Sequence, residues 1–132
     1  SSNLSKISSN NRIGLKLKAR GSYGQARGFF RQALKLNPSN GRPYLSIATM
    51  YAKSANNCGQ SNFDKRAVYW LAAAEARKAA RVDPTQKKNA AKSVANYNAK
   101  APQKSEIFSS GRAGQTIKIG CWIGASVTVP SI

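Results

Sequence analysis

The segment from Tyr23 to Leu36 repeats its apolar side chains with the period of an α-helix. Asn37 and Pro38 then end the pattern, because a proline cannot continue a helix. The apolar positions follow the spacing i, i+3, i+4 and i+7 of one helical face: Ala26, Phe29, Phe30, Ala33, Leu34 and Leu36. The pattern predicts a helix with one packed face.

Helical patterns also precede and follow this segment. Between Ile7 and Arg20, apolar residues at near-helical spacing predict a first helix of about 12 residues, which Gly21 ends. The connection to the next helix is short, so the two helices should run antiparallel. A second pair is expected at residues 43–53 and 64–82.

A long polar loop at residues 54–63 separates the members of this second pair. After it, one more helix is expected between Lys87 and Pro102, with Ala90, Val94 and Tyr97 on its inner face. This helix has no partner in the sequence, as expected of a cap that closes an array of helix pairs.

The two pairs share a sequence marker. The stretch LKLNPSN returns as ARVDPTQ, and Pro38 and Pro84 are 46 residues apart. This distance exceeds the period of a tetratricopeptide repeat, about 34 residues, by about the length of the polar loop. Over residues 7–84 the chain resembles a tetratricopeptide repeat protein, with matches at Ile13, Gly14, Leu17, Gly21, Tyr23, Ala26, Phe30, Ala33 and Pro38 in the first unit and at Tyr44, Ile47, Ala48, Tyr51, Ala72, Ala76, Ala79 and Pro84 in the second.

The sequence departs from the family pattern by its inserted loop, by Asn10 where tryptophan is common, and by its few acids. The resemblance implies a mainly α fold: an antiparallel helix-pair solenoid of about two units plus a capping helix over residues 7–101. Residues 1–6 are expected to be a disordered N-terminal segment. The array with its Cys-Trp tail also resembles the C-terminal portion of uncharacterised repeat proteins from the envelope of Bacteroidota-type bacteria.

Residues 102–132 differ from the array. Ser105 and Gly111 predict the N-cap and the stop of one helical turn. Apolar residues of one parity then predict a strand, which a turn at Gly124-Ala125 would fold into a β-hairpin: Ile117, Ile119, Cys121, Ile123, Val127 and Val129. An isolated hairpin is marginal in water, so this one should pack on the helices.

The chain is strongly basic. It has 22 Lys and Arg residues, four Asp and Glu residues and no histidine, for a net charge of +18. Such a field attracts polyanions and makes their binding sensitive to salt, although it also serves solubility alone. No apolar run approaches the roughly 20 residues of a membrane-spanning helix, so no transmembrane segment is expected.

Cys58 and Cys121 are the only cysteines, 63 positions apart. Without histidine they cannot form an ordinary four-ligand zinc site. They are either two free thiols, as in a cytoplasmic protein, or one disulfide in an oxidising location such as a periplasm, cell envelope or extracellular space. Cys58 lies in a polar loop, and the loop and the hairpin both need an anchor, so we expect the disulfide.

Each of the four acids has a structural role to fill. Asp83 precedes Pro84 in a helix-ending turn, Asp64 can cap its helix, Glu106 can stand in a first turn, and Glu75 reads as a surface charge. Acid–base catalysis needs a group that titrates near neutrality, usually histidine or a shifted carboxylate. We therefore expect a protein that is not an enzyme and uses no cofactor or metal.

In tetratricopeptide repeats, the first helix of each pair lines a groove that holds extended peptides. The resemblance implies a partner-binding groove formed by Asn11, Leu15, Lys18, Arg42, Leu45, Thr49, Lys53 and Lys88. A basic and apolar groove suits an acidic, partly hydrophobic peptide or protein partner. Leu15 stands where the carboxylate-binding subgroup has asparagine, which argues against that mode.

The alternative is a basic protein that binds RNA or another polyanion, for example on the ribosome. The aromatic residues Tyr23, Phe29, Phe30, Tyr44 and Tyr51 can stack bases, but they occupy core positions of the repeat. Lys and Arg are spread over all the expected helices, which favours nonspecific electrostatic binding over a sequence reader.

Overall fold

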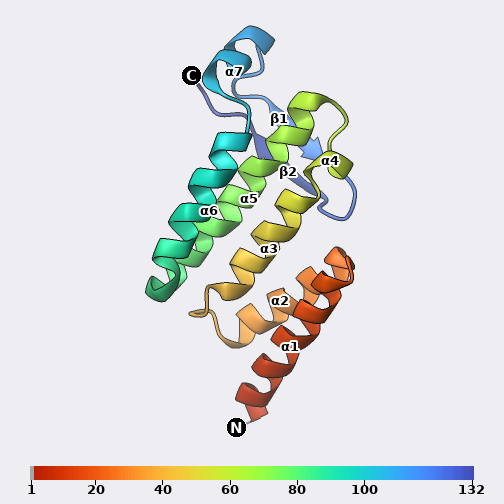
Figure 1. The fold of residues 1–132 in the computed structure, drawn as a ribbon, viewed down its shortest axis with the longest axis vertical. Coiled ribbons are helices and arrows are strands. Elements are labelled where there is room, and N and C mark those ends of the chain that lie inside the picture. Colours follow the sequence, from red (N-terminus) through yellow and green to blue (C-terminus); the bar gives the residue numbers. More distant parts are fainter. Residues whose placement is uncertain (1) are drawn as a thin grey trace.

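The computed structural model describes the backbone of residues 2–132 and their side chains, except those of residues 2–5, 7 and 8; Ser1 lies outside the description (Figure 1). The chain is mainly helical, with a short antiparallel hairpin near its C-terminus, as predicted. In order the elements are α1 (Ser2–Ala19), α2 (Tyr23–Leu36), α3 (Arg42–Lys53), α4 (Ala55–Cys58), α5 (Asn62–Val82), the 3-10 turn η1 (Pro84–Gln86), α6 (Lys87–Lys100), α7 (Lys104–Ser110), β1 (Thr116–Ile119) and β2 (Ala125–Thr128).

Helix α5 is the centre of the arrangement. It packs between α3 and α6, and the two strands lie against it (Figure 1). Alanines at five of its positions are fully buried, and their small side chains let the neighbouring helices approach closely: Ala67, Ala72, Ala73, Ala76 and Ala79. The larger core side chains come from the surrounding elements and include Phe30, Ile47, Met50, Ile119, Ile123 and Val129.

Helices α1 and α2 form a separate pair, and α2 packs against α3 (Figure 1). The close approach within this pair depends on Gly14, because a Cβ atom there would lie 2.7 Å from the ring of Phe30. Phe30 is itself buried. Gly14 and Phe30 thus form a direct contact between the two helices.

Four predictions about element boundaries are corrected by the structure. Residues 2–6, expected to be disordered, belong to α1, since no glycine or proline interrupts the helix there. The inserted loop at 54–63 contains the helical turn α4. The N-cap of α5 is Ser61, whose Oγ accepts a hydrogen bond from the Asp64 N–H at 3.1 Å, and that of α7 is Gln103, where Asp64 and Ser105 were expected.

The hairpin has the predicted facing pattern. Ile117 pairs with Val127 and Ile119 with Ala125, so residues of odd number share the face toward the core. The chain reverses over residues 120–124, which is earlier than the predicted turn at 124–125. Cys121 has a φ of 51° in this turn, a conformation that residues other than glycine seldom adopt.

The reversal is fixed to the helices at several points. A disulfide joins Cys58 of α4 to Cys121, with the two Cα atoms 5.4 Å apart, which confirms the predicted bond. The guanidinium of Arg27 on α2 donates to the backbone carbonyls of Trp122 and Ile123, both at 2.9 Å. The indole N–H of Trp122 donates to Ser54 Oγ at 2.8 Å. The tail is thus tied to both helix pairs.

No helix within residues 2–132 combines the length and the apolar character that crossing a lipid bilayer requires.

Candidate partner-binding groove

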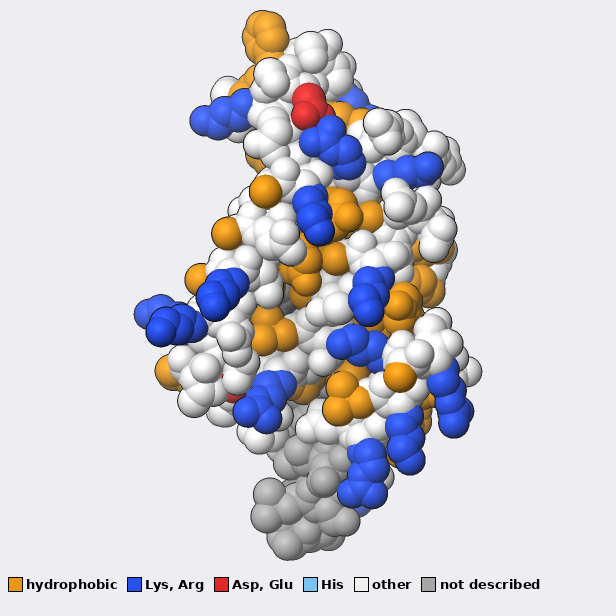
Figure 2. Space-filling view, in the orientation of Figure 1, with side chains coloured by type: hydrophobic (Ala, Val, Ile, Leu, Met, Phe, Trp, Pro, Cys, Tyr) orange, Lys and Arg blue, Asp and Glu red, His pale blue; other side chains and the backbone are white. Residues whose placement is uncertain are grey.

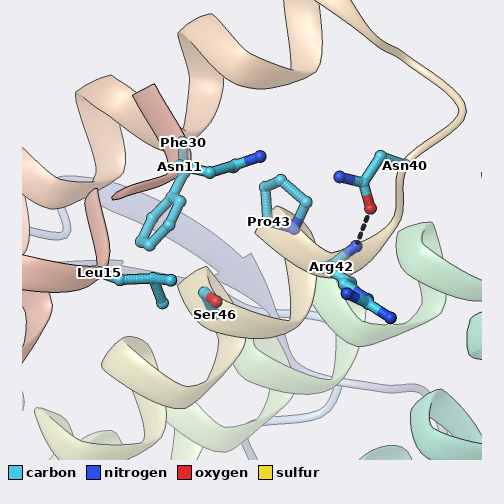
Figure 3. A pocket seen from close by; sticks show the side chains of 7 residues that line it. All are labelled: Asn11, Leu15, Phe30, Asn40, Arg42, Pro43 and Ser46. Atoms are coloured by element: carbon cyan, nitrogen blue, oxygen red, sulfur yellow. Dashed lines mark hydrogen bonds between the residues drawn. The ribbon is translucent and has the colours of Figure 1, made fainter. Parts of the chain in front are cut away.

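Two hollows lie where α1 faces α3. The first, which we call the Phe30 hollow, has a volume of about 260 Å³ and is lined by Asn11, Leu15, Phe30, Asn40, Arg42, Pro43 and Ser46 (Figure 3). The ring of Phe30 points toward Leu15, and the backbone N–H of Arg42 donates to Asn40 Oδ1 at 3.1 Å. Leu15 is 52% exposed, one of three large hydrophobic residues left open to solvent in the described chain.

The second hollow lies at the C-terminal ends of α1 and α3. It is lined by Leu15, Lys18, Ala19, Arg20, Gly21, Tyr23 and Lys53. We call it the cationic hollow, because three of these seven residues are Lys or Arg. Its volume is about 420 Å³, and it shares Leu15 with the Phe30 hollow. Burial and the nearby positive charge of Lys53 lower the pKa of Lys18. No carboxylate lines either hollow.

Five of the eight predicted groove residues line these hollows: Asn11, Leu15, Lys18, Arg42 and Lys53. Leu45 and Thr49 line neither. Leu45 packs against the core, and the hydroxyl of Thr49 donates to the Leu45 carbonyl at 3.0 Å. Lys88 is exposed on α6 and also lines neither hollow. The structure therefore brings together the predicted residues of α1 and the two ends of α3.

Sequence reasoning missed the walls that come from outside the first helix of each pair. Phe30 belongs to α2, Asn40 to the connection before α3, and Tyr23 to the start of α2. These residues reach the hollows because α1 packs closely against α2. In the sequence, the matches of Gly14 and Phe30 to the repeat pattern were the available signal for this close packing.

A third hollow, between α5 and α6, was not predicted. It has a volume of about 550 Å³, and its lining is mostly alanine and valine with cations beside it: Arg77, Ala80, Lys87, Ala90, Ala91, Val94, Ala95 and Asn98. Hydrophobic side chains are visible along α6 at the left margin of Figure 2. This is the outward surface of the last helix in the array.

None of the four carboxylates lines either hollow, although Asp83 accepts a hydrogen bond from the Gly41 N–H and interacts with the charge of Arg42 beside it. Glu75, predicted as a surface charge, is buried, and it accepts hydrogen bonds from Arg31 at 2.8 and 3.2 Å and from Lys78 at 3.2 Å. The prediction was wrong because Arg31 lies on another helix, 44 positions earlier. Glu75 thereby links α5 to α2 through an ion pair whose carboxylate is buried and whose Arg31 side chain is partly exposed.

The other three acids serve similar internal links. Asp64 accepts from Arg112 at 2.9 Å, and Glu106, in the first turn of α7 as predicted, forms an ion pair with Arg66. Asp83, in the predicted helix-ending turn, accepts hydrogen bonds from the backbone N–H of Gly41 and from Thr85. These contacts join α5 to the tail and to the start of α3.

Most of the 22 Lys and Arg residues therefore have no carboxylate partner among the described residues, where Arg31, Arg66, Lys78 and Arg112 form the ion pairs. Figure 2 shows Lys and Arg side chains spread over the whole visible face, with apolar side chains between them. The positive field is thus a property of the surface, while the acids belong to the internal framework.

The aromatic residues are mainly structural. Phe30 and Tyr51 are buried, whereas Tyr23, Phe29 and Tyr44 are half-buried. Tyr23 and Tyr51 pack against Trp122, with ring centroids 5.6 and 5.2 Å apart. This cluster stabilises the hairpin turn, so the core role is the one these side chains fill.

Within residues 2–132, no group of three or more Cys, Asp or Glu side chains comes together in a way that would hold a metal ion. Searches of protein-family models, curated proteins and solved structures found no match to this chain. The candidate groove therefore rests on its own geometry and charge.

Proposed function

We propose that this protein is a tetratricopeptide-like scaffold that has no enzymatic activity and holds an acidic, partly hydrophobic segment of a partner protein. The observation that carries the proposal is the pair of adjoining hollows between α1 and α3. They combine the exposed side chain of Leu15 with the cations Lys18, Arg20, Arg42 and Lys53. An apolar anchor inside a positive surface is complementary to such a segment.

The distribution of acids supports this choice. A protein surface usually neutralises part of its own charge, but here the carboxylates are taken up by links between α5 and other elements. Lys18, Arg20 and Lys53 form no ion pair among the described residues and are free to meet carboxylates of a partner, whereas Arg42 also interacts with the charge of Asp83. The Cys58–Cys121 disulfide supports an oxidising location, which we propose to be a periplasm, cell envelope or extracellular space.

Selection from a random peptide display library against the oxidised chain tests the proposal. Enriched peptides should contain Asp or Glu together with apolar residues, and they should shift NMR amide signals of α1 and α3. Arg42→Ala or Leu15→Ser should weaken their binding about tenfold, as expected for loss of one central contact. Lys118→Ala, an exposed charge change on β1, is the matched control and should leave binding unchanged.

Two results would contradict the proposal: peptides without acidic residues, or amide shifts confined to elements other than α1 and α3. Lys88→Ala tests how far along the surface the partner extends. Because Lys88 lines neither hollow, we expect no loss of affinity from this variant. A loss would show that the partner also reaches α6.

A second candidate, binding of RNA or another anionic polymer, is favoured by the many unpaired cations spread over the visible face (Figure 2). Its affinity should fall by several log units per decade of salt if many phosphates are neutralised. Charge reversal at Lys87 and Lys88 should flatten that slope. Binding that ignores both salt and these substitutions would reject this candidate.

A further inference from the structure

The cationic hollow concentrates positive charge in one place. Lys18 and Arg20 come from the end of α1, and Lys53 is the last residue of α3. Lys18 is half-buried, while Arg20 and Lys53 are exposed at the rim. The chain brings the three side chains together because α1 and α3 both end at this hollow.

Cations at helix ends have a simpler role, since they complement the negative pole of the helix dipole. That role accounts for only part of the charge here. Each helix end carries about half a negative charge, so the ends of α1 and α3 together offset about one of the three positive charges. The hollow keeps a surplus of about two positive charges for a ligand.

No group of the protein supplies that missing charge. Carboxylates do not line the hollow, and the four in the chain are bound by Arg31 and Lys78, by Arg66, by Arg112, and by the Gly41 and Thr85 donors. Burial and the positive charge of Lys53 lower the pKa of Lys18, as expected where no anion balances the two ammonium groups. A bound anion would offset the repulsion between Lys18 and Lys53.

The walls restrict what kind of anion fits. Leu15, Ala19 and Tyr23 give the hollow an apolar side, and Tyr23 is half-buried against Trp122. The volume of about 420 Å³ is larger than a bare oxyanion needs, so it has room for an organic group attached to the anion. Lysine ammonium groups bind phosphate as point charges, and a phosphate monoester carries nearly two negative charges above its second pKa near 6.

We propose that the cationic hollow binds a phosphate monoester, with Lys18, Arg20 and Lys53 around the phosphate and Leu15 and Tyr23 against its organic group. This inference rests on the proposed function where the ester is a phosphorylated side chain of the partner. The same chemistry is carried by small phosphorylated metabolites, and the test separates the two sources.

The test is an NMR titration of the full oxidised chain at pH 8 and constant ionic strength, with phenyl phosphate, methyl phosphate and phenylacetate as probes. Phenyl phosphate should shift the amides of residues 15–23 and of Lys53 to saturation. It should bind more tightly than methyl phosphate, because of the apolar wall, and more tightly than the monoanion phenylacetate. Equal binding of phenylacetate, or shifts outside these residues, would overturn the proposal.

Substitutions with equal charge change locate the site. Lys18→Met and Lys53→Met should each weaken phenyl phosphate about tenfold. Lys16→Met is the matched control, since Lys16 is exposed on the same helix but does not line the hollow. Its affinity should match that of the unmodified chain. If Lys16→Met weakens binding as much as Lys18→Met, the attraction comes from the overall charge and the proposal fails.

Two further arms separate the sources and the two proposals. A phosphoserine peptide that binds more tightly than free phosphoserine identifies a partner side chain, and equal binding identifies a small ester; both support the site. Arg42 lines only the Phe30 hollow, so Arg42→Ala should weaken the binding of acidic peptides and leave the binding of phenyl phosphate unchanged. If the unmodified chain binds acidic peptides but does not bind phenyl phosphate, this inference is refuted and the scaffold proposal stands.

Discussion

The N-terminal helix pair and the C-terminal tail are held to the molecule by different forces. Helix α1 rests on α2 through apolar packing around Gly14 and Phe30, and none of its described side chains takes part in an ion pair. The tail is held by a disulfide, by Arg66 and Arg112 acting on Glu106 and Asp64, and by the Arg27 and Trp122 hydrogen bonds.

The difference follows from what each region can bury. A helix pair offers a broad apolar face, and such packing leaves the opposite face of α1 open to line the groove. A two-stranded hairpin is too small to be stable alone, so directional and covalent links have to fix it. The candidate binding helix α1 is thus attached by apolar packing on α2, whereas the tail is attached by covalent and polar links.

The largest effect should follow from breaking the disulfide. Cys58→Ser with Cys121→Ser frees a loop closed over a sequence separation of 63, which the loop-entropy model values at about 4 kcal/mol. Urea unfolding should show this loss, and the unmodified chain in reducing agent should show the same loss. The amides of the tail should lose hydrogen-exchange protection first. The amides of α1 should lose protection only as far as the lower global stability requires.

The double variant in reducing agent is the control, since it has no disulfide left to reduce. Unchanged stability on reduction of the unmodified chain would mean that the polar links alone hold the tail. An equal loss of protection in α1 would remove the distinction between the two regions.

A smaller effect should come from Gly14→Ala, which tests the apolar attachment of α1. The added methyl group would lie 2.7 Å from the Phe30 ring, so the helices must move apart. Overpacking of this kind destabilises by about 1–3 kcal/mol. Hydrogen exchange should show the loss in α1 and α2. Gly28→Ala, at a position with no atom within 4 Å of the new Cβ, is the matched control and should be neutral or stabilising.

Much of this architecture could be predicted because its signals are local. The period of the apolar residues and the proline stops gave α2, α3, α5 and α6 to within a few residues. The parity of Ile117, Ile119 and Val127 predicted the faces of the hairpin. Ser61 and Asp64 also carry a local signal, because their spacing is that of an N-cap residue and an N3 residue.

The rest depended on contacts between distant segments. Glu75 looks exposed beside Arg77 and Lys78, and only the position of Arg31 on α2 shows that it is buried and paired. The groove was predicted from one helix of each unit, so Leu45, Thr49 and Lys88 were included while Phe30 and Tyr23 were left out. The cationic hollow depends on two helix ends that no sequence spacing places together.

The smallest effect should be the response to acid, which acts on the polar links and not on α1, because α1 contains no Asp or Glu. The hydroxyl of Thr85, at 2.6 Å, and the N–H of Gly41 lower the pKa of Asp83. The hydrogen bond and charge of Arg66 likewise lower the pKa of Glu106. Such carboxyls stabilise the fold above their unfolded pKa, near 4, and this contribution is lost as pH falls through the folded value.

The free energy of unfolding from urea titrations should therefore be flat between about pH 8 and 5 and should decrease below about pH 4. Thr85→Val removes the strongest donor to Asp83, so the pKa of Asp83 rises toward its unfolded value and the Asp83 contribution shrinks. The free energy of unfolding of the variant should be lower than that of the unmodified chain at pH 7 and nearly equal to it at pH 2. Thr85→Ser keeps the hydroxyl and loses the methyl group, so it measures any effect of the changed packing. The same deficit at both pH values would show that Thr85 acts through packing alone. Hydrogen exchange should also show whether α1 opens more easily in acid at a pH where the whole chain is still stable. That result would mean that α1 depends on these carboxylates, contrary to its attachment by apolar packing.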